Sequence, residues 1–261
     1  MHVVVITKSV PDTEATVTVD SGGNINWGDK LVVNPWDEYA ITEAILLKGA
    51  HNVKATVITV GPGEHEEALK HGLAIGCDQA IRIWDDSMQD LDGLVYAKAV
   101  AAAVQKLGDV DLVIFGRELS DIASDQHIYQ TARKLGWNLL GSVAKVDAVD
   151  FATRTIRVER GIEQGTEIAT SQLPAVISVL KDINEPKYPT FIGIRKAAKA
   201  NIPMWNTQEL GLSAEQIIPK AKITGHQELP KREGSVEIIE GSTPQEKAEK
   251  LADKLIQEKV I

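Results

Sequence analysis

Three loops of the sequence carry residue types that can bind an anion, and each follows a short apolar run. The loops are residues 8–13, 61–63 and 116–127, and the runs before them predict buried strands. In a parallel sheet, the loops at the carboxyl ends of the strands converge on one crevice. Backbone N–H groups in such loops, together with a helix N-terminus, favour a negatively charged ligand. The spacing therefore predicts an anion or nucleotide site.

The third loop ends at a predicted helix that begins at Gln126. Ser124 and Asp125 can cap this helix, which is a purely structural role. Gln126 and His127 would then present donors in the first turn, where a phosphate can lie. From these residues alone, a helix cap and a nucleotide site are equally open interpretations.

The residue pattern gives little support to other chemistry. Cys77 is the single cysteine, and it is interpreted as a small buried residue and not as a nucleophile. The histidines, the cysteine and the aspartates lack metal-ligand spacing, so neither a metal site nor catalytic residues are expected. His51, His65 and His71 are assigned to solvated faces of helices.

Strands and helices alternate along the first half of the chain and must position these loops. The predicted strands are residues 3–7, 56–60, 80–84 and 112–115. The predicted helices are residues 35–49, with Asn34 as the N-cap, 64–75, 94–107 and 126–135. A small hairpin of residues 16–19 and 24–26 follows the first strand. The alternation predicts a parallel sheet wrapped by helices.

After Gly136 the pattern changes to strands joined by short polar turns. These strands are residues 142–147, 155–160, 167–170 and 175–180. The short connections favour antiparallel pairing, as an extension of the same sheet. The predicted fold class is therefore α/β: a mainly parallel twisted sheet with flanking helices, of the Rossmann-like kind, extended by antiparallel strands and followed by a C-terminal arm and helix.

The pattern divides the chain into residues 1–200 and residues 201–261. From Ile202 the sequence loses its periodicity, and it ends with a capping sequence, Thr243-Pro244-Gln245-Glu246, before an amphipathic helix. A helix of this size is marginal in water unless its apolar face is buried. The arm is therefore expected to clasp its own domain or another subunit.

The composition is ordinary for a globular protein of 261 residues, with 43% hydrophobic and 25% charged residues. A net charge of −9 argues against general nucleic-acid binding. The first ten residues are interpreted as a strand and not as a signal peptide, and no run approaches the ~20 apolar residues of a membrane helix. A cytoplasmic location without membrane insertion is expected, and the single cysteine fits a reducing compartment.

Residues 181–199, which read KDINEPKYPTFIGIRKAAK, place large apolar side chains where a loop is expected. Pro186 and Pro189 favour extended backbone before them, and residues 190–192 are expected in an exposed loop. A short basic helix with Arg195, Lys196 and Lys199 is expected next. Apolar side chains on such a loop either pack onto their own core or are held out for a partner, and the residues leave both possibilities open.

Residues 184–197 resemble the recognition loop of the β subunit of electron transfer flavoproteins. The family motif is close to N-E-P-[RK]-Y-x-[ST]-L-x-x-I-x-K-A, and the matching residues are Asn184, Glu185, Pro186, Lys187, Tyr188, Thr190, Ile194, Lys196 and Ala197. In the family, the leucine of this loop inserts into an apolar pocket of partner dehydrogenases, and Phe191 holds that place here. Within residues 182–199, the resemblance implies a partner-docking surface of Tyr188, Pro189, Phe191, Ile194, Arg195 and Lys196.

Residues 7–13, 34–40 and 74–80 also match motifs of this family. The resemblance implies that the converging loops hold an adenine nucleotide, which is AMP in ordinary members and a second FAD in electron-bifurcating ones. The expected cofactor-binding residues are Ile6, Lys8, Asn34, Thr59, Val60, Gly61, Gly116, Ser124, Asp125, Gln126 and His127.

Residues 121–129 depart from the family pattern. Asp121 and Gln126 are kept, whereas Asp125 replaces Asn or Ala, His127 replaces Thr or Val, and Ile128 replaces glycine. The Gly-Asp-Thr of the bifurcating form is missing, which favours AMP. In addition, a glycine at position 161 stands where many relatives carry an acidic residue near the cleft that faces the flavin.

Over nearly the whole chain, the resemblance implies the β subunit of a heterodimer whose α subunit holds most of the redox FAD. Such a subunit is an electron carrier and not an enzyme: it passes electrons from flavin dehydrogenases, such as the acyl-CoA dehydrogenases of fatty acid oxidation, to a quinone oxidoreductase. Two alternatives stay open. One is an electron-bifurcating subunit with a second FAD that oxidises NADH. The other is a nucleotide-hydrolysing or nucleotide-sensing protein that works alone.

Overall fold

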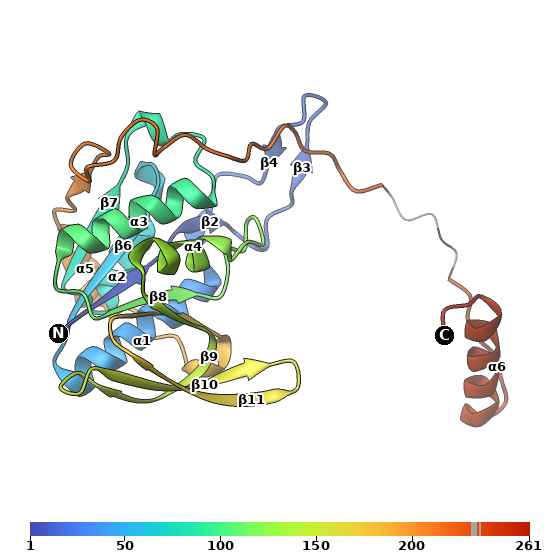
Figure 1. Ribbon diagram of the computed structural model, residues 1–261. Coiled ribbons are helices and arrows are strands. Elements are labelled where there is room, and N and C mark those ends of the chain that lie inside the picture. Colours follow the sequence, from blue (N-terminus) through green and yellow to red (C-terminus); the bar gives the residue numbers. More distant parts are fainter. Residues whose placement is uncertain (231–233, 235) are drawn as a thin grey trace. The chain divides into compact units, whose positions relative to one another are not determined.

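The computed structural model describes residues 1–230, 234 and 236–261. It divides into two compact units, Met1–His226 and Gln227–Ile261 (Figure 1). The sequence predicted a boundary after residue 200, whereas residues 201–226 belong to the first unit.

The first unit is built on a nine-stranded sheet with the order β11-β10-β9-β12-β8-β1-β6-β7-β13. The strands are β1 (His2–Ile6), β6 (Lys54–Val60), β7 (Gln79–Ile83), β8 (Leu112–Gly116), β9 (Asn138–Asp150), β10 (Thr155–Ile162), β11 (Gly165–Gln172), β12 (Ala175–Val179) and β13 (Met204–Trp205). All neighbouring strands in the part of the sheet with the order β9-β12-β8-β1-β6-β7-β13 pair parallel. Strand β10 pairs antiparallel with both β9 and β11. The predicted α/β class is confirmed.

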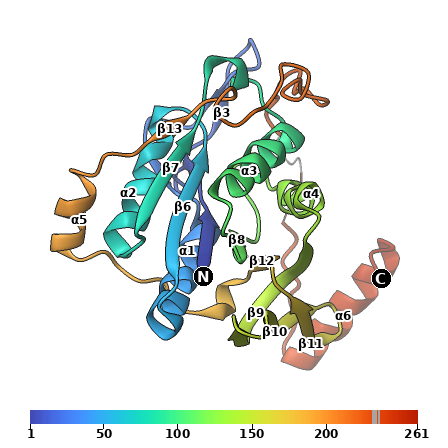
Figure 2. The ribbon, with the colours of Figure 1, turned by 60° about the vertical axis from the view of Figure 1, so that its left-hand side comes forward.

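Helices cover both faces of this sheet (Figure 2). They are α1 (Pro35–His51), α2 (Glu66–Ile75), α3 (Gly93–Leu107) and α4 (Gln126–Leu135). Because side chains alternate along a strand, Val3 and Val5 of β1 pack with α1 and α2, and Val4 and Ile6 pack with α3 and α4. The largely apolar central strands β1, β8 and β12 are buried along their whole length, as parallel strands between two helix layers must be.

Strand β12 does not follow the predicted antiparallel pattern, because it pairs parallel with both β8 and β9. Strand β9 bends at Ser142, whose φ is +57°, and its far end turns back to the amino ends of the strands. There Arg154 pairs with Asp111 at 3.0 Å, and the ring of Phe151 meets that of His51. The chain leaving β11 is therefore already beside the start of β8, so a short connection leads into a parallel strand.

The ends of two predicted helices need correction. Helix α1 passes the predicted end at Gly49 and stops where Asn52 adopts a left-handed φ of 52°. The helix predicted from residue 64 starts as the 3-10 turn η1 (Gly63–His65) and becomes α-helical at Glu66. Helix α4 has the predicted bounds, because Gly136 supplies the left-handed residue that ends it.

Short elements complete the first unit. Strands β3 (Thr18–Val19) and β4 (Ile25–Asn26) form the predicted hairpin, and β2 (Ser9–Pro11) pairs with β5 (Leu31–Val33). The 3-10 turns η2 (Asp86–Met88) and η3 (Lys181–Ile183) and the short helix α5 (Phe191–Ala197) lie in connections. Phe191, predicted in the loop before the basic helix, is the first residue of α5, because the Thr190 side chain caps that helix at the Gly193 N–H, 3.0 Å away.

Residues 203–226 are called the strap (Figure 1, orange). The strap begins with β13, which pairs with β7 at the edge of the sheet, and then runs along α3. Lys98 donates to the Gln216 carbonyl at 2.6 Å, and Asp85 accepts from the Thr207 N–H at 2.8 Å. Ile217 is buried in the core beneath α3. The strap is thus fixed to the sheet domain although its sequence has no periodicity.

The second unit contains α6 (Pro244–Gln257). Thr243 caps it by accepting from the Glu246 N–H at 3.2 Å, and the Glu246 carboxylate accepts from the Ser242 N–H at 2.8 Å. The predicted capping sequence therefore starts the helix as expected. Leu251 and Ile256 are exposed on it. In the described residues, the structure has no helix with the length and apolar content needed to span a bilayer.

The folding back of β9–β11 onto the core beneath α1 can be tested at Ile156, which is fully buried on β10. Ile156→Ala should lower the free energy of unfolding by about 2–5 kcal/mol, since it removes a large side chain from a closed core. Ile168→Ala, on the neighbouring β11 and 56% exposed, should change it by less than about 0.5 kcal/mol. Urea denaturation of both variants checks this, and equally small effects would contradict the packing.

Candidate functional site

Two side chains at the start of α1, Asn34 and Asp37, tie together the loops at the carboxyl edge of the sheet. Asp37 accepts from the Lys8 backbone N–H at 3.0 Å and from the Asn34 amide at 2.9 Å. The Asn34 amide also donates to the Glu118 carbonyl at 2.9 Å and accepts from the Ser120 N–H at 3.1 Å. This Asn34–Asp37 bracket joins the loop after β1 to the loop after β8.

The bracket explains why Asn34 does not act as the predicted side-chain cap of α1. It holds the N-cap position, but its side chain makes no capping bond, because it is committed to the neighbouring loop. Burial raises the pKa of Asp37 to about 7. The N–H groups that donate to its carboxylate lower the pKa, but burial has the larger effect. Gly116 passes so close that a Cβ there would lie 2.5 Å from Asp37 Oδ1 and 2.6 Å from the Trp36 backbone.

A cavity of about 540 Å³ opens beside the bracket, beyond the carboxyl ends of the parallel strands. This volume is within the ~300–1,000 Å³ of small-molecule sites. Six of the expected cofactor-binding residues line it: Lys8, Val60, Gly61, Ser124, Gln126 and His127. The three loops predicted to converge therefore do so.

The other five expected residues do not line the cavity. Ile6 lies in the core and Thr59 is buried in β6. Asn34 and Gly116 belong to the bracket. Asp125 is exposed at the start of α4, where its side chain makes no capping bond. Ser124 faces the cavity instead of capping the helix, and its carbonyl accepts from the Leu119 N–H.

The polar end of the cavity has unused hydrogen-bonding capacity. Lys8 Nζ pairs with Asp121 Oδ2 at 2.5 Å, and both side chains are largely buried. Within the described residues, the second carboxylate oxygen of Asp121 and Nδ1 of His65 are buried without a partner. Buried polar atoms are normally satisfied, so these atoms indicate a site for a polar ligand.

Two histidines face this end of the cavity, His65 from η1 and His127 from the first turn of α4. Burial, with the nearby Lys8 ammonium, lowers the pKa of each to about 4, so both are neutral near pH 7. The assignment of His65 to a solvated helix face is therefore wrong. His71 is also half-buried, and burial lowers its pKa.

The rest of the lining was largely missed by sequence reasoning. The missed residues include Trp84, Leu91, Asp92, Tyr96, Ile122 and Ile223. The strap brings Ile223 there, and Asp92 holds the strap by accepting from the N–H groups of Lys220 and Ala221, at 2.6 and 3.1 Å. No sequence pattern places residue 223 beside residue 8.

A second feature, residues 182–199, is anchored on α1. The Asn184 amide donates to the Tyr39 carbonyl at 3.1 Å and to the Glu43 carboxylate at 3.0 Å. The Lys187 N–H donates to the Thr42 hydroxyl at 3.0 Å. Polar side chains of a buried helix face thus hold the segment in place.

The apolar side chains of this segment point away from the core. Tyr188 is 93% exposed and Phe191 is 74% exposed, and Ile192 and Ile194 are also exposed. The Arg195 guanidinium lies 6.0 Å from the Phe191 ring centroid. Of the two possibilities left open by the sequence, packing onto the chain's own core is therefore excluded for Phe191 in this chain.

Residues 26–210 match the family model described as the electron transfer flavoprotein domain. The chain belongs to the electron transfer flavoprotein family. It is 32% identical to the electron transfer flavoprotein subunit beta of Bacillus subtilis (strain 168), over 263 residues that cover 100% of both chains. The resemblance seen in the sequence is thereby confirmed, and the chain is a β-type subunit of this family, which acts in electron transfer.

Two other relatives come from different systems. The caffeyl-CoA reductase-Etf complex subunit CarD of Acetobacterium woodii is 31% identical over 265 residues, covering 100% of both chains. Protein FixA of Azorhizobium caulinodans is 32% identical over 238 residues, covering 89% of this chain and 83% of the relative.

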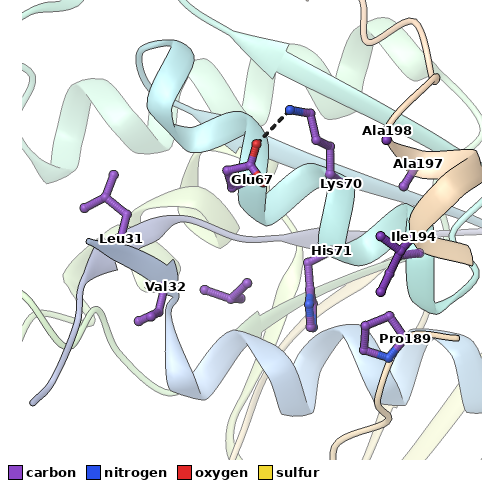
Figure 3. Close-up of a pocket in the computed structure, with 11 residues that line it drawn as sticks. Leu31, Val32, Glu67, Lys70, His71, Pro189, Ile194, Ala197 and Ala198 are labelled. Atoms are coloured by element: carbon purple, nitrogen blue, oxygen red, sulfur yellow. Dashed lines mark hydrogen bonds and ion pairs between the residues drawn. The ribbon is translucent and has the colours of Figure 1, made fainter. Parts of the chain in front are cut away.

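In this electron transfer flavoprotein chain, a groove of about 420 Å³ adjoins α5 (Figure 3). Pro189 and Ile194 face His71 of α2, and Leu31 and Val32 line the groove from β5. Gly193 allows α5 to approach α2, because a Cβ there would lie 2.1 Å from the Ala74 carbonyl oxygen. The exposed apolar side chains therefore stand on a closely packed base.

The bracket can be tested at Gly116. Gly116→Ala should destabilise the protein by about 1–3 kcal/mol, because its Cβ would displace Asp37 and with it the Lys8 loop. Gly49→Ala is the matched control, since a Cβ there meets nothing within 4 Å and alanine favours a helix by about 0.5–1 kcal/mol. Thermal unfolding of both variants checks this. Equal behaviour of both variants would contradict the role of the bracket.

Proposed function

We propose that the chain is the β subunit of a heterodimeric electron transfer flavoprotein and that its cavity holds one AMP. The α subunit holds most of the FAD that supplies the redox chemistry, and this chain completes that site. The pair carries electrons from flavin dehydrogenases, of acyl-CoA type, to a quinone oxidoreductase. The observation that carries the proposal is the cavity in which Lys8 meets the N-terminus of α4, beside an exposed and firmly anchored recognition loop.

The residues of the cavity fit an adenine mononucleotide. A phosphate lies at the end where Lys8, Gln126 and His127 meet, since backbone N–H groups of a helix first turn and an ammonium both favour an anion. The base lies toward Trp84 and Leu91, where an aromatic ring and an aliphatic side chain are available for stacking. The sequence departures at residues 125 and 128 leave this arrangement possible, because Asp125 is exposed and Ile128 is buried in the core.

The loop of residues 121–129 supports AMP over a second FAD. It lacks the Gly-Asp-Thr that the bifurcating form of the family carries, and His127 and Ile128 stand where that form has valine and glycine.

The docking surface is the recognition loop with Phe191 at its centre. Because Asn184 and Lys187 fix the loop on α1, Phe191 can enter a partner's apolar pocket with little loss of conformational freedom. Arg195, Lys196 and Lys199 surround it with positive charge on a chain of net charge −9, which suits an acidic partner. Tyr188 and Pro189 extend the same surface.

The arm after the strap is the proposed contact with the α subunit. Helix α6 exposes Leu251 and Ile256, and Ile238 before it is also exposed. An amphipathic helix with such a face is stabilised by burial against a partner.

A bifurcating subunit with a second FAD is the second candidate. Relatives named FixA and CarD, the latter part of a caffeyl-CoA reductase-Etf complex, favour it. The missing Gly-Asp-Thr in residues 121–129 weighs against it.

Counting nucleotides separates these candidates. The αβ complex is purified, denatured, and its released nucleotides are separated chromatographically. One FAD and one AMP per dimer are expected. Two FAD would establish the bifurcating alternative, and a dimer that releases neither AMP nor a second FAD would overturn the nucleotide site.

Docking is tested with Phe191→Ala. This variant should raise the KM of an acyl-CoA dehydrogenase for the αβ complex by about tenfold or more, as for a central interface residue, with unchanged FAD content. Ile168→Ala removes an exposed side chain on β11 and should have no such effect. Unaltered kinetics in the Phe191 variant would contradict the docking role.

A further inference from the structure

His127 is a buried polar side chain without a hydrogen-bond partner at the polar end of the cavity. The residue is 4% exposed, lies in the first turn of α4, and lines the cavity. Its ring makes T-shaped contacts with the rings of Tyr96 and Phe115, whose centroids lie 5.2 and 5.6 Å from its own. Within the described residues its ring nitrogens have no hydrogen-bond partner in the protein and, unlike Nδ1 of His65, are not fully buried, so a ligand in the cavity can reach them.

Several charged groups share this end of the cavity with His127. The loop after β1 provides Lys8, and the loop after β8 provides Asp121. The turn η1 provides His65 and Glu64. Helix α3 provides Tyr96 and its N-cap Asp92, and α4 provides no acidic side chain in its first turn.

A phosphate that enters this site meets a lysine that is already neutralised. The Lys8 ammonium lies 2.5 Å from the Asp121 carboxylate, and Glu64 and Asp92 are further negative groups. The charge of a phosphate dianion is therefore left largely uncompensated, and a further positive charge beside it would be stabilising. His127 is at the right place to supply it, since the phosphate lies at the N-terminus of α4.

In the ligand-free chain, His127 is held neutral. Burial and the Lys8 ammonium lower its pKa to about 4, and a cation at a helix N-terminus is further disfavoured by the helix dipole. An anion at the same place opposes the effects of the Lys8 ammonium and of the helix dipole, because it attracts the imidazolium. The charge state of the ring thus depends on what the cavity contains.

We propose that His127 takes up one proton from the solvent when the phosphate of the nucleotide binds, so that nucleotide binding is linked to pH. This rests on the proposed nucleotide site. The imidazole nitrogen that lacks a proton gains one, the buffer loses one, and the imidazolium donates to a phosphate oxygen. Binding should therefore strengthen as the pH falls, by up to tenfold per pH unit for one proton.

Calorimetry of AMP binding to the nucleotide-depleted αβ complex tests this. Titrations at pH 7.5, in two buffers with different heats of ionisation, give the number of protons taken up. At this pH the phosphate, whose second pKa is about 6, is already a dianion, so protons taken up belong to the protein. Between one half and one proton per AMP is expected, and adenosine, which lacks the phosphate, should bind without uptake.

The variant His127→Thr should bind AMP about tenfold more weakly and with no proton uptake. His71→Asn, in the groove beside α5, is the matched control and should keep the uptake. If His127→Thr does not fold, the comparison of AMP with adenosine on the wild-type complex still decides. AMP binding without proton uptake, or uptake that is lost in His65→Asn and kept in His127→Thr, would overturn this proposal alone. A complex that binds no AMP would overturn the nucleotide site as well.

Discussion

The arrangement of this subunit depends on the buried Asn34–Asp37 bracket. Four hydrogen bonds from two side chains join the loops after β1 and β8 to the start of α1. Each of these loops contributes one partner of the Lys8–Asp121 pair. The position of a charged pair beside the cavity is thus determined by Asn34 and Asp37, which do not line the cavity themselves. This is a common arrangement, in which a second set of residues fixes the ones that bind.

The recognition loop uses the same principle on the other side of α1. Glu43 is buried in the helix, where burial raises its pKa, and it holds the Asn184 amide. The polar anchor lies underneath and the apolar side chains lie outside. A loop held in this way presents Phe191 in one orientation, so the exposed aromatic ring is confined to the proposed docking surface.

Much of the sheet domain was predictable, because local patterns and the fold agreed. The continuous apolar runs identified the central strands, and Gly136 marked the end of α4. The predictions failed where a distant contact overrode a local signal. Asn34 has the ideal type for a helix cap but bonds to a loop more than eighty residues away. The kink at Ser142 changed the direction of the chain, so that a short connection led into a parallel strand and not an antiparallel one.

The candidate site was predictable to the same extent. Loops at strand ends must converge, and Lys8, Gly61 and His127 do line one cavity. The prediction that His65 lies on a solvated helix face was wrong, because the sequence does not indicate which way a histidine near the start of a helix faces. The strap was also beyond prediction, since a segment without periodicity carries no local indication of where it packs.

The cavity is assembled from opposite ends of its unit. Lys8 lies near the first residue, whereas Ile223 lies three residues before the end of the unit at His226. During synthesis on the ribosome, the sheet can form and bury its core before the last wall of the cavity has been made. The cavity is therefore closed only after almost the whole unit has emerged, so any binding in it belongs to the completed subunit and not to the growing chain.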